Sequence, residues 1–363
     1  MRYNWQQKDW PDFQYQTIYI EDLLFDFAQR TGRISGVLQG LSETEQTEAM
    51  INLMVSEAIK TSEIEGEYLS RNDVMSSIRR NLGLNPELPL TKDKRAEGIA
   101  ELMLAVRDDF LKPLRSQVLF DWHSMLMKGN TQIQIGHWRT HKEPMQIVSG
   151  GIGREVIHFE APPSSKVTSE MDDFIKWFNT SQGEIKKPII RAAIAHLYFE
   201  TIHPFEDGNG RIGRAVAEKA LSQSIGRPVL FSLSKSIEVN KNAYYDALQG
   251  AQRSNEITDW INYFVRTVLD AQIDAELEIE FTLKKTKFFD ELKDSLNERQ
   301  QKVVRRMLEE GHQGFEGGMN ARKYVSLART SKATATRDLQ DLVAKGIFKP
   351  IGGGRSTRYE INV

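Results

Sequence analysis

The chain contains no cysteine among its 363 residues. This excludes disulfide bonds, thiol catalysis and cysteine-ligated zinc. No uninterrupted apolar run approaches the length that spans a bilayer, and the first residues lack the apolar core of a signal peptide. The formal net charge is only −2, so the overall charge favours neither nucleic acid nor a membrane surface as a partner. We therefore expect a soluble cytoplasmic protein that has no membrane partner.

Alternating stretches rich in valine and isoleucine are also scarce, whereas apolar residues recur at intervals of three and four over most of the chain. This periodicity predicts a mainly α-helical fold. The length allows two or three domains. We expect an N-terminal helical segment over residues 1–110, a central core over 111–275, and a connecting helix with a C-terminal domain over 276–363.

The densest group of chemically capable residues is the run 203–214, which lies between two predicted helices. Pro204 biases the first helix to end just before it and leaves His203 at the rim of the loop. Gly208 and Gly210, with Asn209 between them, can turn several backbone N–H groups toward one point. Because the next helix begins here, its N-terminus would also favour an anion such as phosphate.

The charged residues of this run suit phosphate chemistry. Arg211 and Arg214 are three residues apart, so they share a helix face and could each clamp a phosphate. Asp207 offers a hard oxygen ligand for Mg²⁺. His203 could act as a general base near neutral pH. The alternative interpretation is a tight, charged, helix-capping loop, because Gly-Asn-Gly turns are common and a single histidine before proline is usually structural.

The whole run matches His-x-Phe-x-Asp/Glu-Gly-Asn-Gly-Arg-x-x-Arg and therefore resembles the Fic (Fic/Doc) family of protein adenylyltransferases. The resemblance covers roughly residues 1–270 and implies a Fic-type helical bundle with a small β-hairpin flap. It implies transfer of AMP from ATP to a serine, threonine or tyrosine hydroxyl of a target protein, with Mg²⁺ as cofactor.

In the reaction that the resemblance implies, His203 would take the hydroxyl proton, Asp207 would bind Mg²⁺, and Phe205 would anchor the loop in the core. The nucleotide-binding residues that it implies in this run are Asp207, Gly208, Asn209, Gly210, Arg211, Gly213 and Arg214. The phosphotransferase branch of the family carries lysine where this chain has Gly210.

A second pattern lies just after a predicted helix that begins near residue 45. Thr61, Glu65 and Gly66 fit Ser/Thr-x-x-x-Glu-Gly/Asn, and the first two lie on the same helix face because they are four residues apart. The pattern resembles the inhibitory helix of the Fic family. That resemblance implies an ion pair between Glu65 and Arg214, which would keep Arg214 from the γ-phosphate of ATP. The alternative is a solvated acidic helix end.

Short apolar residues alternate over residues 145–159 around a glycine-rich centre, which predicts a β-hairpin. The resemblance implies the Fic flap, which pairs with an extended target segment and aligns its hydroxyl with the catalytic histidine. The flap residues would be Ile147, Val148, Ser149 and Gly150, with Ile157 on the second strand. A surface hairpin without a function is the alternative.

Tyr244 and Tyr245, followed by Gln252, resemble the adenine side of the Fic pocket. An aromatic face can stack on a purine, and an amide can meet its polar edge. Family members often carry asparagine where this chain has Gln252. Ordinary core packing of the two tyrosines is the alternative interpretation.

The C-terminal segment has a different character. From residue 320 to the end, nine Lys and Arg face three Asp and Glu, a local balance of 9 − 3 = +6. Two short helical stretches separated by a turn, followed by two strands, predict a winged helix-turn-helix. Its recognition helix would present Thr334, Thr336, Arg337 and Gln340. Such a domain binds DNA or another protein, and the pattern leaves both open.

The expected partners are therefore ATP, a protein target that could be the chain itself, a second copy in a homodimer, and DNA through the C-terminal domain. The alternative function is that of a nucleotide-sensing, DNA-binding transcriptional regulator.

Overall fold

The computed structural model describes residues 3–84, 91–149, 156–292, 295–308, 314, 315 and 317–362. Within these residues the chain forms fourteen α-helices and two antiparallel two-stranded sheets, so the predicted mainly α-helical class is confirmed. None of the described helices is long and apolar enough to cross a membrane. The chain divides into two compact units, Met1–Ser35 with Met50–Ile273 and Gly36–Ala49 with Asp274–Val363. The three-part division expected from the sequence stays a prediction.

Three helices have residues in both units, and the others belong to one. The three are α1 (Glu21–Gln39), α2 (Glu43–Ile64) and α11 (Thr258–Leu292). The helices of the first unit are α3 (Arg71–Asn81), α4 (Lys94–Asp108), α5 (Ser116–Leu126), α6 (Ser164–Glu184), α7 (Pro188–Ile202), α8 (Asn209–Ile225), α9 (Leu233–Val239) and α10 (Lys241–Ala251).

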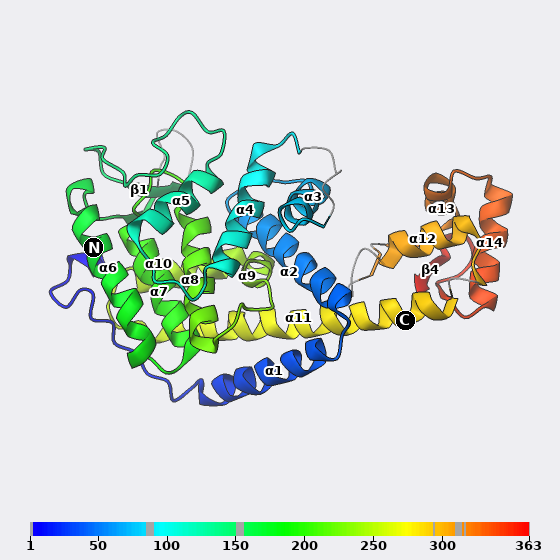
Figure 1. Cartoon of the computed structure of the whole chain (residues 1–363), viewed down its shortest axis with the longest axis horizontal. Helices are drawn as coiled ribbons and strands as arrows, with labels where there is room; N and C mark the ends of the chain where they lie inside the picture. The colour runs from blue at the N-terminus through cyan, green and yellow to red at the C-terminus, as the bar shows by residue number, and fades with distance from the viewer. Residues whose placement is uncertain are drawn as a thin grey trace. The chain divides into compact units, whose positions relative to one another are not determined.

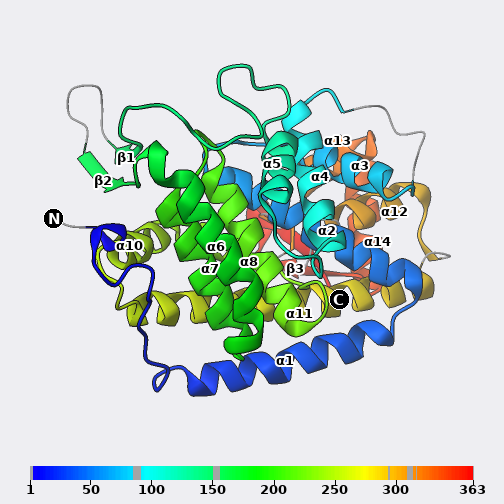
Figure 2. The ribbon, with the colours of Figure 1, turned by 60° about the vertical axis from the view of Figure 1, so that its left-hand side comes forward.

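Helix α7 is the core of the first unit. Pro188 occupies its first turn, where the missing N–H is not needed. Every residue from Ile189 to Ile202 is buried, which fits a mostly apolar sequence, although Arg191, His196 and Glu200 are buried with it. Helices α6 and α8 lie beside α7 in both views (Figure 1, Figure 2). This packing fixes the end of α7 and the start of α8, so the loop between them is held from both sides.

A β-hairpin lies in the first unit where the sequence predicted it. Strands β1 (Gln146–Ser149) and β2 (Val156–Glu160) pair antiparallel, with Ile147 opposite Phe159. Phe159 is buried, whereas Val148 and Ile157 are about half exposed. Phe159 therefore anchors the hairpin in the core, while Val148 and Ile157 form an accessible apolar surface. Gly150 lies outside the described residues.

The N-terminal segment lies against the first unit. A 3-10 turn, Asn4–Gln6, is tied down by the Asn4 N–H, which donates to the Gln252 carbonyl at 2.9 Å. The Trp10 ring packs edge-on against Tyr198 of α7 at a centroid distance of 5.0 Å. The aromatic residues of this segment thus cover α7.

The second unit contains the predicted winged-helix elements. These are α12 (Glu298–Leu308), α13 (Ala321–Ala328), α14 (Lys332–Ala344), β3 (Phe348–Ile351) and β4 (Arg358–Ile361). Its core includes Val303, Tyr324, Leu339 and Phe348. The expected connecting helix from residue 276 is not a separate element, because α11 runs unbroken from Thr258 to Leu292. No glycine or proline interrupts that stretch, so nothing in the sequence ends the helix earlier.

Candidate active site

The loop after α7 begins at His203, which has left-handed backbone angles (φ 51°, ψ 60°). Such angles are uncommon for a residue other than glycine, so neighbouring groups must hold them. Arg139 does this: its Nε donates to the His203 carbonyl at 2.7 Å, and its Nη2 donates to the Ile202 carbonyl at 3.2 Å. The Arg139 side chain is buried and satisfies carbonyls that the end of a helix leaves without partners.

Two further side chains fix the middle of the loop. Phe205 is fully buried and stacks on the His123 ring at a centroid distance of 4.1 Å, which confirms the predicted anchor. The Asn209 amide closes the loop, since its oxygen accepts from the Phe205 N–H at 2.9 Å and its nitrogen donates to the Phe205 carbonyl at 2.8 Å. Asn209 therefore sets the shape of the loop through its side chain.

Arg214, on the second turn of α8, is buried against the end of α2. Its Nε donates to the Thr61 hydroxyl at 2.7 Å, and its Nη2 donates to the Thr61 carbonyl at 2.9 Å and to Glu65 Oε1 at 2.8 Å. Burial alone would lower the pKa of Arg214, but the Glu65 carboxylate outweighs it and holds that pKa above the usual value. The ion pair between Glu65 and Arg214 that the sequence predicted is present.

The Glu65 carboxylate also lies over the start of α8. A Cβ placed on Gly210 would come 2.2 Å from Glu65 Oε1 and 3.2 Å from an Arg214 nitrogen. Glycine is needed at position 210 for this approach. The carboxylate thus occupies the position where the helix N-terminus and an arginine would attract a phosphate.

Gly66 explains how the chain turns after Glu65. Its φ is +82°, and the N–H groups of Gly66 and Glu67 donate to the carbonyls of Glu63 and Ser62. This is the hydrogen-bond pattern of a Schellman cap, which favours glycine at that position. The cap ends α2 and returns the chain toward α8, where Glu67 Oε2 accepts from Arg211 Nη1 at 2.7 Å. Both arginines predicted to hold phosphates are therefore ion-paired with acids from this one turn.

Asp207 has the properties of a single-carboxylate magnesium ligand. Its side chain is 54% exposed, and only Oδ1 is engaged, accepting from the Gly208 N–H at 2.6 Å. No cluster of three acidic or histidine ligands exists among the described residues. Mg²⁺ commonly uses one or two carboxylates together with substrate phosphate oxygens, so the residues here fit a metal that arrives with a nucleotide.

His203 has the protonation state of a base. Burial, together with the positive charge of Arg139, lowers its pKa to about 4. The imidazole is therefore neutral at neutral pH. Its side chain is still 12% exposed, so the ring is not sealed in the core. A neutral, partly accessible imidazole beside an anion position can take a proton from a hydroxyl.

The predicted adenine residues lie in different environments. Tyr244 is buried, and its hydroxyl is 2.8 Å from His196 Nε2. Gln252 is also buried, with its amide nitrogen 3.4 Å from the Glu200 carbonyl. Tyr245 is 40% exposed, and its hydroxyl donates to the Ile64 carbonyl at 3.3 Å. In this conformation Tyr245 offers the accessible ring, while adenine contacts of all three residues stay predictions.

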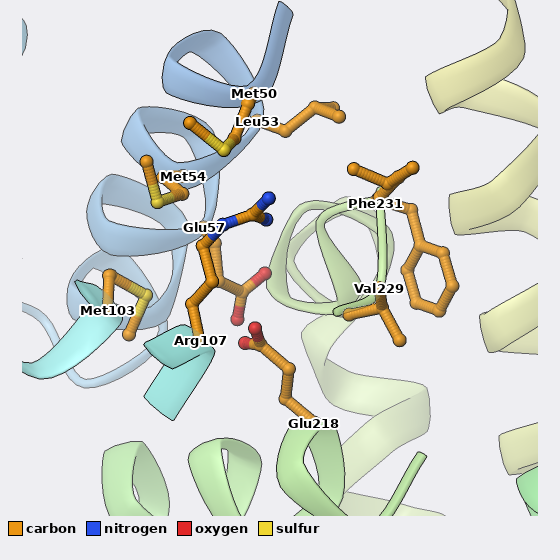
Figure 3. A pocket seen from close by; sticks show the side chains of 10 residues that line it. Met50, Leu53, Met54, Glu57, Met103, Arg107, Glu218, Val229 and Phe231 are labelled. Carbon is orange, nitrogen blue, oxygen red and sulfur yellow. The ribbon is translucent and has the colours of Figure 1, made fainter. Parts of the chain in front are cut away.

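A second acid of α2, Glu57, lies away from the loop and lines a small cavity together with Glu218 of α8. Glu57 Oε2 accepts from the Ser232 hydroxyl at 2.8 Å and from the Ser234 N–H at 2.9 Å. Figure 3 shows the carboxyl groups of Glu57 and Glu218 pointing toward one another in a small cavity that Arg107 also lines. Burial, and then the Glu57 charge, raise the pKa of Glu218 to about 8. Glu218 therefore carries a proton at neutral pH.

Comparison with protein families places the loop in context. A model described as "Fic/DOC family" matches residues 113–221, and one described as "Domain of unknown function (DUF4172)" matches residues 3–84. Residues 113–221 of this chain are therefore similar to the Fic/DOC family. The matched stretch includes the complete loop and α8 as far as residue 221. The resemblance to the Fic family that the loop motif indicated is therefore confirmed for this stretch of the chain.

Curated relatives match parts of this chain. "Protein adenylyltransferase Fic" of Aedes aegypti is 34% identical over 100 residues, 28% of this chain and 18% of that protein. The protein of the same name from Nematostella vectensis is 28% identical over 173 residues, 47% of this chain and 38% of that protein. The matched part thus spans well under two thirds of these relatives.

Solved structures share the fold. A Fic family protein from Desulfovibrio desulfuricans aligns with a TM-score of 0.56 at 17% identity and covers 96% of this chain and 97% of that one. A Fic domain containing signaling protein from Bacteroides thetaiotaomicron aligns with a TM-score of 0.54 at 17% identity and covers 72% of this chain and 97% of that one. At such identities the likeness concerns the fold.

Sequence reasoning did not find several residues of this site. Arg139 supports the loop from a distant segment, so no local spacing marks it. Glu57 and Glu218 lie on helices far apart in the sequence. Glu200 is different: it precedes His203 by three residues, and that one-turn spacing could have revealed it.

Proposed function

We propose that this chain transfers AMP from ATP to a hydroxyl group of a protein side chain. The observation that supports this most directly is the surroundings of Gly210. An anion position at the start of α8 adjoins Arg214, and the loop that leads into α8 carries a neutral imidazole at His203. The curated relatives named protein adenylyltransferases support the same class of reaction.

In the proposed reaction the target hydroxyl oxygen attacks the α-phosphorus of ATP. A new O–P bond forms, the bond from that phosphorus to the oxygen bridging to the β-phosphate breaks, and pyrophosphate leaves with the bonding electrons. His203 accepts the hydroxyl proton. The N–H groups at the start of α8, Arg211 and Arg214 hold the phosphates. Asp207 would hold Mg²⁺, which would supply charge neutralisation at the phosphate oxygens.

We place the protein target along the β1–β2 hairpin. Among the described residues β1 pairs with β2 alone, so its other edge has no strand beside it, and Val148 and Ile157 offer apolar surface. An extended target segment could pair with such an edge and bring its hydroxyl toward His203.

The same geometry supports autoinhibition by Glu65. The carboxylate and a nucleotide phosphate carry the same sign of charge and would compete for Arg214 and for the space above Gly210. While Glu65 holds that position, ATP cannot bind in the orientation that transfer requires.

Incubation with Mg²⁺ and radiolabelled ATP tests the function through self-labelling of the full chain. We expect Glu65→Gly to raise labelling by at least about tenfold, since one charged hydrogen bond contributes about 1.5–3 kcal/mol. The His203→Ala variant in the same background should label at background level. Glu63→Gly is the matched control, because Glu63 lies on the same turn but pairs with Lys60 at 2.6 Å. Equal labelling by all variants would contradict both the transfer and its inhibition.

A second function, DNA binding by the second unit, is favoured by the charge on α14. The Asp338 carboxylate turns inward, where it accepts from Arg299 Nε at 2.9 Å and from the Tyr324 hydroxyl at 3.0 Å. Lys332 and Arg337 are exposed on the same helix. The outward face of α14 is thus more basic than its sequence suggests, as a phosphate backbone requires.

A gel-shift experiment on a DNA duplex at increasing salt tests this second function. We expect binding that weakens as salt rises, and Arg337→Ala should weaken it further at every salt concentration. Absence of any shift at low salt would instead favour a protein partner for this unit.

A further inference from the structure

Glu200 is a buried acid that the proposed reaction does not use. It lies on α7, one turn before His203, and is 3% exposed. Its Oε2 is 3.7 Å from Nδ1 of His203. Among the described residues, neither His203 Nδ1 nor the other carboxyl oxygen, Glu200 Oε1, has a hydrogen-bond partner, and both atoms are buried. A ring nitrogen without a partner thus lies near a carboxyl group inside the core, where an unmade hydrogen bond is costly.

The space that Glu200 occupies depends on a glycine of the loop motif. A Cβ on Gly213 would lie 2.2 Å from Glu200 Oε1 and 3.3 Å from the His196 ring. Only glycine lets the carboxyl group lie between α7 and α8 beside the catalytic imidazole. Gly213 therefore has a packing role in addition to any contact with nucleotide.

Near neutral pH, the shifted pKa values leave both members of the pair neutral. Burial is the main cause that raises the pKa of Glu200 to about 8, the Glu65 carboxylate adds to the rise, and Arg214 opposes it. Burial and Arg139 lower the pKa of His203 to about 4, while Glu65 and Asp207 act in the opposite direction. The two groups therefore meet as a carboxylic acid and a neutral imidazole, which can share one hydrogen bond without forming an ion pair.

We propose that Glu200 is a positioning residue, whose buried carboxyl oxygen accepts the Nδ1–H proton of His203 and leaves the lone pair of Nε2 free for the hydroxyl proton. A neutral imidazole has one donor and one acceptor nitrogen, so a fixed acceptor at Nδ1 selects the tautomer that can act as a base through Nε2. A separation of 3.7 Å before nucleotide binds agrees with catalytic hydrogen bonds that tighten only in the substrate complex. The inference rests on the proposed function for its catalytic consequence, but the tautomer itself can be measured without any turnover.

The main-chain carbonyl of Glu200 also faces the His203 ring and is the competing acceptor. That carbonyl already lies 3.4 Å from the Gln252 amide nitrogen, whereas the carboxyl Oε1 lacks a partner. Substitution of the side chain separates the two acceptors, because it removes the carboxyl group and keeps the carbonyl.

The first measurement is the ring ¹⁵N NMR spectrum of the full chain labelled at its seven histidines. The His203 signals are those absent from the His203→Ala spectrum. We expect the Nδ1–H tautomer in the wild-type chain and in Glu200→Gln, whose amide oxygen can still accept. Glu200→Ala should give a mixture of tautomers. An unchanged tautomer in Glu200→Ala would overturn the proposal and assign the role to the main-chain carbonyl.

The second measurement is the kinetics of self-labelling in the Glu65→Gly background. Glu200→Ala should lower kcat by about tenfold at an unchanged KM for ATP, and Glu200→Gln should restore most of it. Glu218→Gln is the control, because it removes another buried carboxyl group of raised pKa from α8, and it should leave kcat unchanged. A normal kcat in Glu200→Ala would overturn the positioning role. A tautomer change without labelling in any variant would contradict the proposed function alone.

Discussion

Two acidic contacts join α2 to α8, and they differ in the charge that meets the acid. Near the loop, Glu65 meets the cation of Arg214 and forms an ion pair, and Arg214 also donates to the Thr61 hydroxyl. Two helical turns earlier on α2, Glu57 meets a second acid, Glu218. The first contact lowers the energy of both charges, whereas the second is tolerated because one of its acids keeps a proton.

This difference in charge shows which of the two acids can compete with a bound anion such as phosphate. A carboxylate that fills an anion position can be displaced by another anion, since the cation and the helix N-terminus serve either one. The pair of acids offers no such site to a phosphate. It responds to proton concentration, so the same two helices combine a ligand-sensitive contact with a pH-sensitive one.

The largest effect should come from filling the space above Gly210. In the Glu65→Gly background, Gly210→Ala places a methyl group where we propose that a phosphate binds, although the carboxylate is gone. We expect self-labelling to fall by at least about 100-fold, comparable to the removal of an oxyanion donor. Isothermal titration with ATP should show the matching loss of affinity.

The control for that substitution is Gly183→Ala on α6, where an added Cβ meets nothing within 4 Å. It should label like its parent. If Gly210→Ala also kept its labelling, Glu65 and the nucleotide would not occupy the same position. The interpretation that nucleotide displaces Glu65 from Arg214 would then be wrong.

The next effect concerns the pair of acids and the pH dependence of stability. The pKa of Glu218 is about 8 in the folded chain, above its usual value near 4.3 in an unfolded chain. A raised pKa contributes stability below the unfolded value, and that contribution is lost as pH rises through the folded value. Glu218→Gln should therefore raise the free energy of unfolding at about pH 9 by roughly 1–2 kcal/mol, or about 3–6 °C in Tm.

Thermal unfolding of both chains between about pH 5 and 9 measures this difference. The wild-type Tm should fall more steeply with pH than that of Glu218→Gln. Glu184→Gln, at the exposed end of α6, is the control and should follow the wild-type curve. Parallel curves for the wild type and Glu218→Gln would show that the pKa of Glu218 is not raised in the folded chain.

The sequence predicts the first contact and misses the second for a physical reason. The loop and the end of α2 are short runs whose spacing, glycines and charges are visible locally, so they show a family resemblance, and that resemblance implies the roles of Glu65, Arg214 and Phe205. A separate connecting helix is expected within α11 because the composition changes there from apolar to charged, although nothing in the stretch breaks a helix. Arg139, Glu57 and Glu218 depend on which elements pack together, and only the fold brings their partners near.

The smallest effect should come from Gly66, which holds Glu65 in place only through the backbone. Its φ of +82° disfavours a side chain, yet an added Cβ would meet nothing within 4 Å. Gly66→Ala should therefore cost about 1 kcal/mol of stability through backbone strain alone. The strain favours conformations in which the end of α2 loosens and Glu65 leaves Arg214. Labelling should therefore rise about two- to fivefold. Gly226→Ala is a close control, because Gly226 has the same φ, the same open space, and a cap position at the end of α8. It should lose similar stability without any gain in labelling, whereas an equal gain in both variants would attribute the release to general destabilisation and not to the position of Glu65.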